Sequence, residues 1–140
     1  MPAPMLDSYL FFDGQCAEAM RFYERVTGGT LKAMMKYSES PPGQCPPGSE
    51  NRIMHASVTV GDRNLMASDS PAGQHKPMQG FSLSLFLDTA EEAKQKFDLL
   101  AEGGTVQMPL GPTFWAKAFG MVTDRFGTPW MVSGGSLQPS

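Results

Sequence analysis

The order of apolar and polar positions along the chain is the same in its two halves. Residues 8–13 form an apolar run that ends in a polar residue, which is typical of a strand followed by a turn. Apolar residues then recur at helical spacing over residues 15–26, and Gly28 and Gly29 end that pattern. Residues 81–87 repeat the strand pattern. We therefore expect two copies of one structural unit.

A second helical pattern follows the second strand at the same distance. Thr89 and Glu92 have the spacing of a capping box at its start, and glycines at 103–104 end it. Asp13 and Asp88 end the two leading strands, 75 residues apart, and we expect both to help cap the helices that follow. The common offset of about 75 residues supports an internal repeat.

Three further strands are predicted after each helix, so the chain is predicted to be an α+β protein made of two βαβββ repeats. The expected strands lie at about 7–13, 30–37, 53–60 and 63–69, and at about 81–87, 104–109, 117–123 and 129–134. We expect residues 1–140 to form a single domain, with repeat one at about 6–69, a linker at about 70–80 and repeat two at about 81–135. A Pro- and Gly-rich loop at 38–51 accounts for the extra length of the first copy.

Composition limits the classes of partner and compartment. The chain has 140 residues, a net charge of −3 and 11 Lys and Arg residues without a basic run, so no nucleic acid partner is expected. No apolar run approaches the roughly 20 residues that a membrane-spanning helix needs, and no signal peptide is visible. Cys16 and Cys45 are too few for a disulfide framework and have no neighbouring histidine to activate them. We expect a cytoplasmic protein.

The motifs along the chain resemble a known superfamily. They include the strand at 9–12 with Phe22-Tyr23, the pair Met54-His55, the segment 65–69, and a C-terminal run from Thr113 to Trp130. A paired βαβββ chain with these motifs resembles the glyoxalase/bleomycin-resistance/extradiol dioxygenase (vicinal oxygen chelate) superfamily, and most closely its PhnB-like branch, described as 3-demethylubiquinone-9 3-methyltransferase-like. The resemblance implies a cup-shaped sheet and a homodimer. It does not choose among isomerases, dioxygenases and sequestering proteins.

The resemblance also implies four metal-ligand positions, one on the first and one on the last strand of each copy. They fall on Ser8, Met66, Ser82 and Met131. Hydroxyl and thioether groups are poor ligands for the divalent metals of this superfamily, so we expect no metal and no other cofactor. No glycine-rich turn follows a strand as a methyl-donor site would require. Metal-dependent chemistry and methyl transfer are therefore disfavoured.

Strand alternation predicts which side chains face the cup. If Ser8 points inward, Leu10 and Phe12 do as well, whereas Tyr9 and Phe11 lie under the helix. By the same rule Ser84, Phe86 and Ser133 face the cup in the second copy. Alternation along the third strand places His55 on the cavity side. The expected ligand-binding residues are Ser8, Leu10, Phe12, His55, Met66, Ser82, Trp115 and Met131.

These walls favour a metal-free protein that binds a small apolar or aromatic molecule in the cup between its repeats. The alternative is a metal-independent enzyme, isomerase- or transferase-like, that uses His55 as acid or base, with Ser8 or Ser82 orienting the substrate. No carboxylate is expected beside His55 to orient it, which favours binding over catalysis. Enzymatic activity stays open on the sequence alone.

Overall fold

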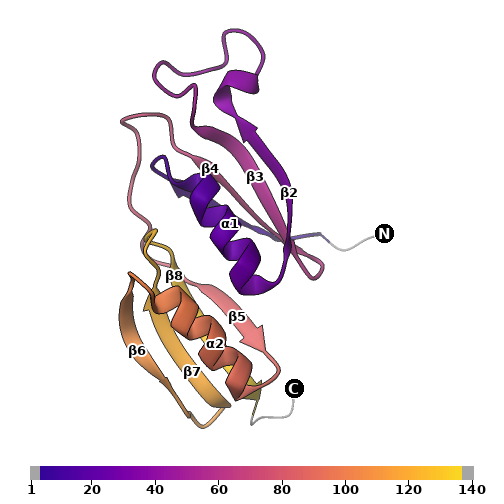
Figure 1. Ribbon diagram of the computed structural model, residues 1–140, viewed down its shortest axis with the longest axis vertical. Coiled ribbons are helices and arrows are strands. Elements are labelled where there is room, and N and C mark those ends of the chain that lie inside the picture. Colours follow the sequence, from indigo (N-terminus) through magenta and orange to yellow (C-terminus); the bar gives the residue numbers. More distant parts are fainter. Residues whose placement is uncertain (1–3, 137–140) are drawn as a thin grey trace. The chain divides into compact units, whose positions relative to one another are not determined.

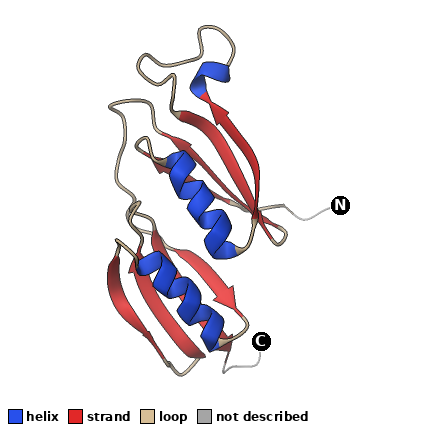
Figure 2. Cartoon of the chain, viewed as in Figure 1, coloured by secondary structure: helices blue, strands red, loops and turns tan. Residues whose placement is uncertain are grey.

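The computed structural model describes residues 4–136 and divides the chain into two compact units, Met1–Lys76 and Pro77–Ser140. The division falls inside the segment expected to link the two repeats. Each unit consists of one sheet and one helix that lies across one face of it (Figures 1 and 2). Among the described residues, the helices are all too short and polar to cross a membrane.

The first unit forms one four-stranded sheet. Its elements are β1 (Ser8–Phe12), α1 (Cys16–Thr27), β2 (Thr30–Lys36), a short 3₁₀ helix (Tyr37–Glu39), β3 (Ile53–Val60) and β4 (Arg63–Asp69). The strand order is β1-β4-β3-β2. β1 pairs in parallel with β4, and the other pairs are antiparallel.

The second unit repeats this arrangement. Its elements are β5 (Leu83–Leu87), α2 (Ala90–Ala101), β6 (Thr105–Gly111), β7 (Ala116–Thr123) and β8 (Pro129–Ser136). The strand order is β5-β8-β7-β6, with β5 parallel to β8. The predicted α+β fold of two βαβββ repeats is confirmed, and the strand bounds differ from the expected ones by at most two residues.

The core of the first unit lies between α1 and the sheet. The helix buries Met20, Tyr23 and Val26, and the strand below it buries Leu10 and Phe12. The rings of Phe12 and Tyr23 have centroids 6.3 Å apart. Burial of this apolar surface is the main stabilising contribution to the unit.

This packing corrects the predicted face of β1. Leu10 and Phe12 are 2% and 1% exposed beneath the helix, and Ser8 shares their side of the strand. Tyr9 and Phe11, expected in the core, are instead 40% and 53% exposed. The error has a physical cause: positions 8 and 82 are 74 residues apart, whereas the strands repeat at 75. A slip of one residue moves every side chain to the other face.

A buried carboxylate joins three parts of the first unit. Asp69, the last residue of β4, is 1% exposed. Its Oδ1 accepts hydrogen bonds from the backbone N–H groups of Gly14 and Cys16, at 2.8 and 3.0 Å, at the start of α1. Its Oδ2 accepts from the N–H of Ile53, at 2.9 Å, where β3 begins. The α1 N-terminus is thus capped from another strand, and Asp13, expected to cap it, pairs with Arg52 instead.

The second unit holds its helix differently. Thr89 is the N-cap of α2 and accepts a hydrogen bond from the N–H of Glu92 at 3.1 Å. This confirms half of the expected capping box. Asp88, which was expected to help cap α2, is not the cap.

Gly134 in β8 occupies the position that Asp69 has in the first unit. A Cβ atom there would lie 2.3 Å from the carbonyl oxygen of Thr89, so only glycine allows this close approach.

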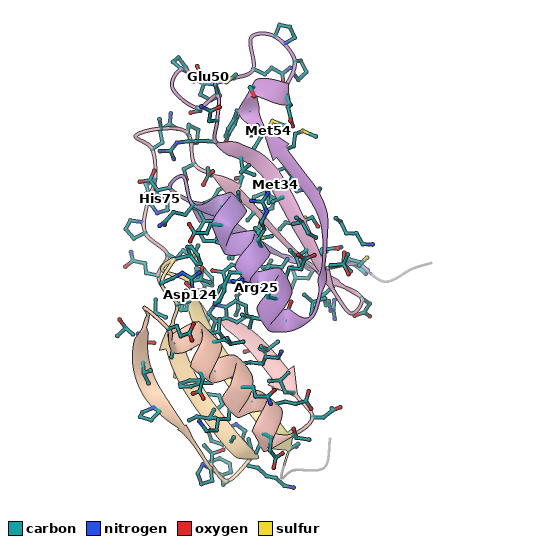
Figure 3. All side chains as sticks on the ribbon, viewed as in Figure 1. Arg25, Met34, Glu50, Met54, His75 and Asp124 are labelled. Atoms are coloured by element: carbon teal, nitrogen blue, oxygen red, sulfur yellow. The ribbon has the colours of Figure 1, made fainter. Side chains whose placement is uncertain are left out.

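The turn between β7 and β8 is organised by Asp124 (Figure 3). Its Oδ1 accepts from the N–H groups of Phe126 and Thr128, and its Oδ2 accepts from Nε1 of Trp130 at 2.9 Å. Asp124 is therefore the side chain that holds this turn together. Its carboxylate also fixes the indole of Trp130 in the core.

We predict that Asp69→Asn lowers the free energy of unfolding by about 2–4 kcal/mol, because an amide cannot accept from three N–H groups and turns a donor toward one of them. Urea unfolding followed by circular dichroism measures the change. Asp62→Asn, in the exposed turn between β3 and β4, is the matched control and should shift stability by less than about 0.5 kcal/mol. Equal midpoints for the two variants would contradict this account of Asp69.

Candidate functional site

The candidate binding surfaces are the sheet faces opposite the helices, which we call the open faces. In the first unit this face carries Tyr9 on β1, Met35 on β2, His55 on β3 and Met66 on β4. Tyr9 pairs with Met66, and Met35 pairs with His55, so the four side chains lie on one side of the sheet. Together with Phe11 they form an exposed aromatic and thioether surface.

A hydrogen bond lies within this surface. The hydroxyl of Tyr9 is 3.1 Å from Nδ1 of His55. The centroid of the Tyr9 ring is 5.7 Å from that of His55 and 5.3 Å from that of Phe11. The three rings therefore lie side by side, and His55 has a hydroxyl partner where the sequence suggested no orienting group.

The open face of the second unit carries the repeat equivalents. Ser84 pairs with Met131 and donates a weak hydrogen bond to its Sδ at 3.9 Å. Phe86, two residues further along β5, pairs with Ser133 and is 77% exposed. Phe86 thus occupies the position that Phe11 occupies in the first unit.

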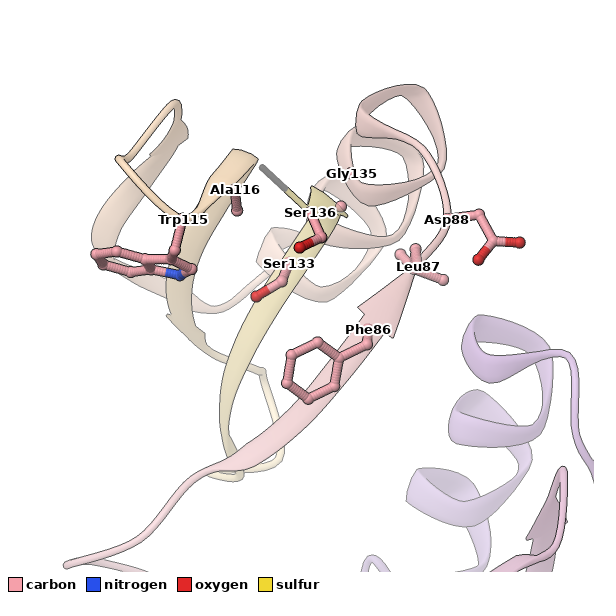
Figure 4. Close-up of a pocket in the computed structure, with 9 residues that line it drawn as sticks. Phe86, Leu87, Asp88, Trp115, Ala116, Ser133, Gly135 and Ser136 are labelled. Carbon is pink, nitrogen blue, oxygen red and sulfur yellow. The ribbon is translucent and has the colours of Figure 1, made fainter. Parts of the chain in front are cut away.

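A cavity of about 380 Å³ lies at one end of this face. Figure 4 shows the indole of Trp115 and the ring of Phe86 on either side of Ser133. The remaining lining comes from β5, β7 and β8 and from the residue after β5: Leu87, Asp88, Ala116, Gly134, Gly135 and Ser136. Two large aromatic walls with hydroxyl and backbone polar groups on the floor suit a small, flat, mostly apolar molecule.

The loop before β7 fixes the position of Trp115. Oγ1 of Thr113 accepts hydrogen bonds from the N–H groups of Trp115 and Ala116, at 3.3 and 3.1 Å. The indole contacts the rings of Phe114 and Phe119 edge to face, with centroids 4.7 and 5.3 Å apart. Trp115 is therefore held by local hydrogen bonds and ring contacts before any ligand arrives.

A smaller cavity of about 250 Å³ lies toward the other end of β5 and β8. Its lining includes Ser82, Gln107, Met121 and Pro129. The side-chain amide of Gln107 and the hydroxyl of Ser82 are polar groups in this lining. The expected site residue Ser82 therefore lies in a different hollow from Trp115.

The structure thus distributes the expected site residues over several places. Within the first unit, His55 and Met66 share the open face, while Leu10 and Phe12 belong to the core and Ser8 lies on their side. In the second unit Trp115 lines the larger cavity, Ser82 the smaller one, and Met131 pairs with Ser84 on the same face. Ligand contact at any of them stays a prediction.

Two residues of the candidate site were not predicted from the sequence. Tyr9 was placed in the core by the one-residue slip, although its position 75 residues before Ser84 indicates the open face. Phe86 was placed on the correct face but was not expected to bind a ligand. It is nevertheless more exposed than Trp115, the other large ring at the cavity. A strict offset of 75 along β1 and β5 identifies both.

Cys16 does not offer an activated nucleophile. Cys16 is fully buried in α1, and burial together with the nearby Asp69 carboxylate raises the pKa of its thiol far above the usual value. Thiolate, the reactive form, is therefore suppressed at Cys16. The thiol of Cys45 is 3.6 Å from the carbonyl oxygen of Pro46, in the loop between β2 and β3.

Two sheets, each backed by one helix and built in βαβββ order, define a class of paired-repeat proteins. The family model of the Glyoxalase/Bleomycin resistance protein/Dioxygenase superfamily matches residues 5–132. The chain belongs to this superfamily, and the resemblance drawn from its motifs is confirmed.

Individual relatives narrow the placement. Protein YjdN of Escherichia coli is 36% identical over 144 residues, which cover 96% of this chain and 98% of that protein. The crystal structure of PA1353 from Pseudomonas aeruginosa is 48% identical, with a TM-score of 0.88 over 95% of this chain and 98% of that one. A Bacillus cereus structure named as a putative 3-demethylubiquinone-9 3-methyltransferase, PhnB protein, is 28% identical, with a TM-score of 0.78 over 94% of this chain and all of that one.

The four positions that the resemblance implies for a metal do not fit a divalent ion; they are Ser8, Met66, Ser82 and Met131. Strand pairing places Met66 beside Tyr9 instead of Ser8, and Met131 beside Ser84 instead of Ser82. With either set, each unit offers one hydroxyl and one thioether. Within residues 4–136 there is no group of three or more His, Cys, Asp and Glu side chains that could hold a metal. Hard and borderline divalent ions prefer carboxylate and imidazole ligands.

We predict that Zn²⁺, Ni²⁺ and Mn²⁺ leave the melting temperature of the purified protein unchanged, because a tightly bound ligand would stabilise the fold by mass action. Differential scanning fluorimetry with each ion, beside elemental analysis of the dialysed protein, measures this. About one metal ion per chain surviving dialysis would overturn the assignment of these positions.

Proposed function

We propose that the protein binds a small apolar or aromatic molecule on the open faces of its sheets, without a metal, in the cytoplasm. The observation that carries this proposal is the cavity between Trp115 and Phe86, with the hydroxyl of Ser133 on its floor. Large exposed aromatic side chains at a cavity are typical of ligand sites rather than of ordinary surface. That the ligand occupies a cup formed by both repeats stays a prediction.

Composition supports a small molecule as the partner. The basic residues are scattered and the net charge is −3, so the chain offers no concentrated positive charge to bind nucleic acid or an anionic membrane surface. The 11 methionines include Met35 and Met66 on the first open face and Met131 on the second. Their flexible thioethers allow such surfaces to adapt to ligands of different shape.

We predict that Trp115→Ala and Phe86→Ala each weaken binding of an apolar dye, anilinonaphthalene sulfonate, by about 1–3 kcal/mol, the value of burying one large apolar side chain. Fluorescence titration at constant salt gives the dissociation constants. Leu99→Ala is the control, because Leu99 is a large exposed side chain on α2, outside the cavity lining. Dissociation constants within twofold of wild type for both cavity variants would exclude this cavity as the site.

A metal-independent enzyme that uses His55 as acid or base is the second candidate. The hydrogen bond between the Tyr9 hydroxyl and Nδ1 of His55 favours it, because a catalytic histidine needs a group that orients its ring. Ser8, one of the two residues expected to orient the substrate, lies on the core side of β1, and Ser82 lies in the second unit. This leaves His55 without the expected substrate-orienting serines on its own open face.

The two candidates differ in what His55 does. For a binding protein, His55→Ala should cost about 1 kcal/mol of affinity, the value of one hydrogen bond. For an enzyme, it should slow turnover by about 100-fold or more and leave binding nearly intact. Molecules that copurify with the native protein, identified by mass spectrometry, supply the compounds for both assays. Turnover that depends on His55 would replace the binding proposal with the enzymatic one.

The methyltransferase name of the Bacillus cereus relative does not transfer well to this chain. The positive-φ glycines at 28 and 103 lie at the ends of α1 and α2, where they terminate helices instead of opening a phosphate-binding turn. The sequence therefore indicates no glycine-rich turn at which a methyl donor would bind.

We also propose that the protein is a homodimer, as the family resemblance implies. The segment 70–80, rich in Gly, Pro and polar residues, would permit an exchange of units between chains. Multi-angle light scattering at tens of micromolar should give twice the chain mass of 15.2 kDa. A mass of one chain under these conditions would count decisively against the dimer.

A further inference from the structure

The pair formed by Tyr9 and His55 is the one polar contact between side chains within the aromatic surface of the first open face. Tyr9, on β1, reaches across β4 to His55 on β3, and the Oη to Nδ1 distance is 3.1 Å. Within residues 4–76 the recorded hydrogen bond to this imidazole is at Nδ1 alone, so Nε2 is available to a ligand. Half-buried His55 thus has one nitrogen engaged and one open.

The direction of this hydrogen bond decides what the open nitrogen offers. A neutral imidazole has one donor and one acceptor nitrogen, and the bond made by one nitrogen sets the state of the other. The phenol O–H is more acidic than a neutral imidazole N–H, and an imidazole nitrogen is a better acceptor than a phenol oxygen. This comparison favours Tyr9 as the donor to Nδ1, in which case the hydrogen of the neutral ring is on Nε2.

We propose that Tyr9 is a positioning residue that holds His55 as an Nε2–H donor, and that the first open face binds aromatic molecules carrying an acceptor oxygen, such as an aromatic ketone. The inference rests on the proposed binding function and names the chemical class of its ligand. Phe11, Met35 and Met66 supply the apolar contacts around the donor. A ligand that only fills apolar surface would leave Nε2–H without a partner.

The ring arrangement supports a defined site instead of a solvated pair. The ring of Tyr9 contacts the rings of both Phe11 and His55, so its hydroxyl oxygen cannot move far from His55 without loss of these ring contacts. In the second unit the equivalent of Tyr9 is Ser84, whose hydroxyl faces the sulfur of Met131 at 3.9 Å. The donor pair is therefore particular to the first unit.

The tautomer of His55 can be measured without any ligand. The chain contains two histidines, so ¹⁵N-labelled protein gives two ring systems in a two-bond ¹H–¹⁵N spectrum, and His55→Gln assigns them. At pH 8 we expect one tautomer for His55, with hydrogen on Nε2, and a mixture of tautomers in Tyr9→Phe. Tyr37→Phe is the matched control, because it removes a hydroxyl of the same unit that donates to the carbonyl oxygen of Asp69. Hydrogen on Nδ1 in the wild type would overturn the inference.

Ligand preference is measured with two probes of similar size, 2-acetylnaphthalene and 2-isopropylnaphthalene. Wild type should prefer the ketone by about two- to tenfold, the ratio that one net hydrogen bond supplies. His55→Ala should abolish the preference, Tyr9→Phe should reduce it, and Tyr37→Phe should preserve it. Equal binding of the two probes by wild type would overturn this inference and leave the proposed function standing. Failure of both probes to bind would overturn the proposed function, and this inference with it.

Discussion

The first unit depends on the buried carboxylate of Asp69. The parallel pairing of β1 with β4 ends at this residue, α1 begins over it, and β3 starts beside it, so three chain segments far apart in sequence meet at two oxygen atoms. A buried carboxylate is tolerable only when hydrogen bonds replace its hydration, and the three N–H groups do so. The second unit has the same topology without this charge. There α2 caps itself through Thr89 and packs directly on the backbone of Gly134, so repeated architecture does not require repeated chemistry.

The sequence was informative where alternation was clear. Around β5, polar Ser82 and Ser84 alternate with Leu83, Leu85 and Leu87, and the predicted faces agree with the structure. In β1 four consecutive residues, Tyr9 to Phe12, are all apolar, so the pattern does not distinguish the core face from the open face and the choice rested on a count that was wrong by one. The role of Asp69 could not be read from the sequence, because its partners lie 16 to 55 residues away and are backbone groups without a sequence signature.

The two open faces share a plan and differ in polarity. Each places a phenylalanine on its first strand and a methionine on its last, at positions related by the repeat. The first adds an imidazole with a hydroxyl partner, and the second adds an indole and a cavity floor of serine hydroxyls. The thioethers of Met66 and Met131 give surfaces suited to apolar contact, and the few polar groups around them add hydrogen-bonding capacity.

Gly134 also bears on how ligand preference can change in evolution. Its neighbours Ser133 and Gly135 line the cavity beside Trp115, while Gly134 itself is pressed against the carbonyl oxygen of Thr89. Substitution of Gly134 is excluded, because any side chain there would push α2 and β8 apart. Substitutions of Ser133 and Ser136 change side chains that line the cavity and do not meet this close backbone contact. Under the proposed binding function, ligand preference can therefore change through those two serines without a change of fold.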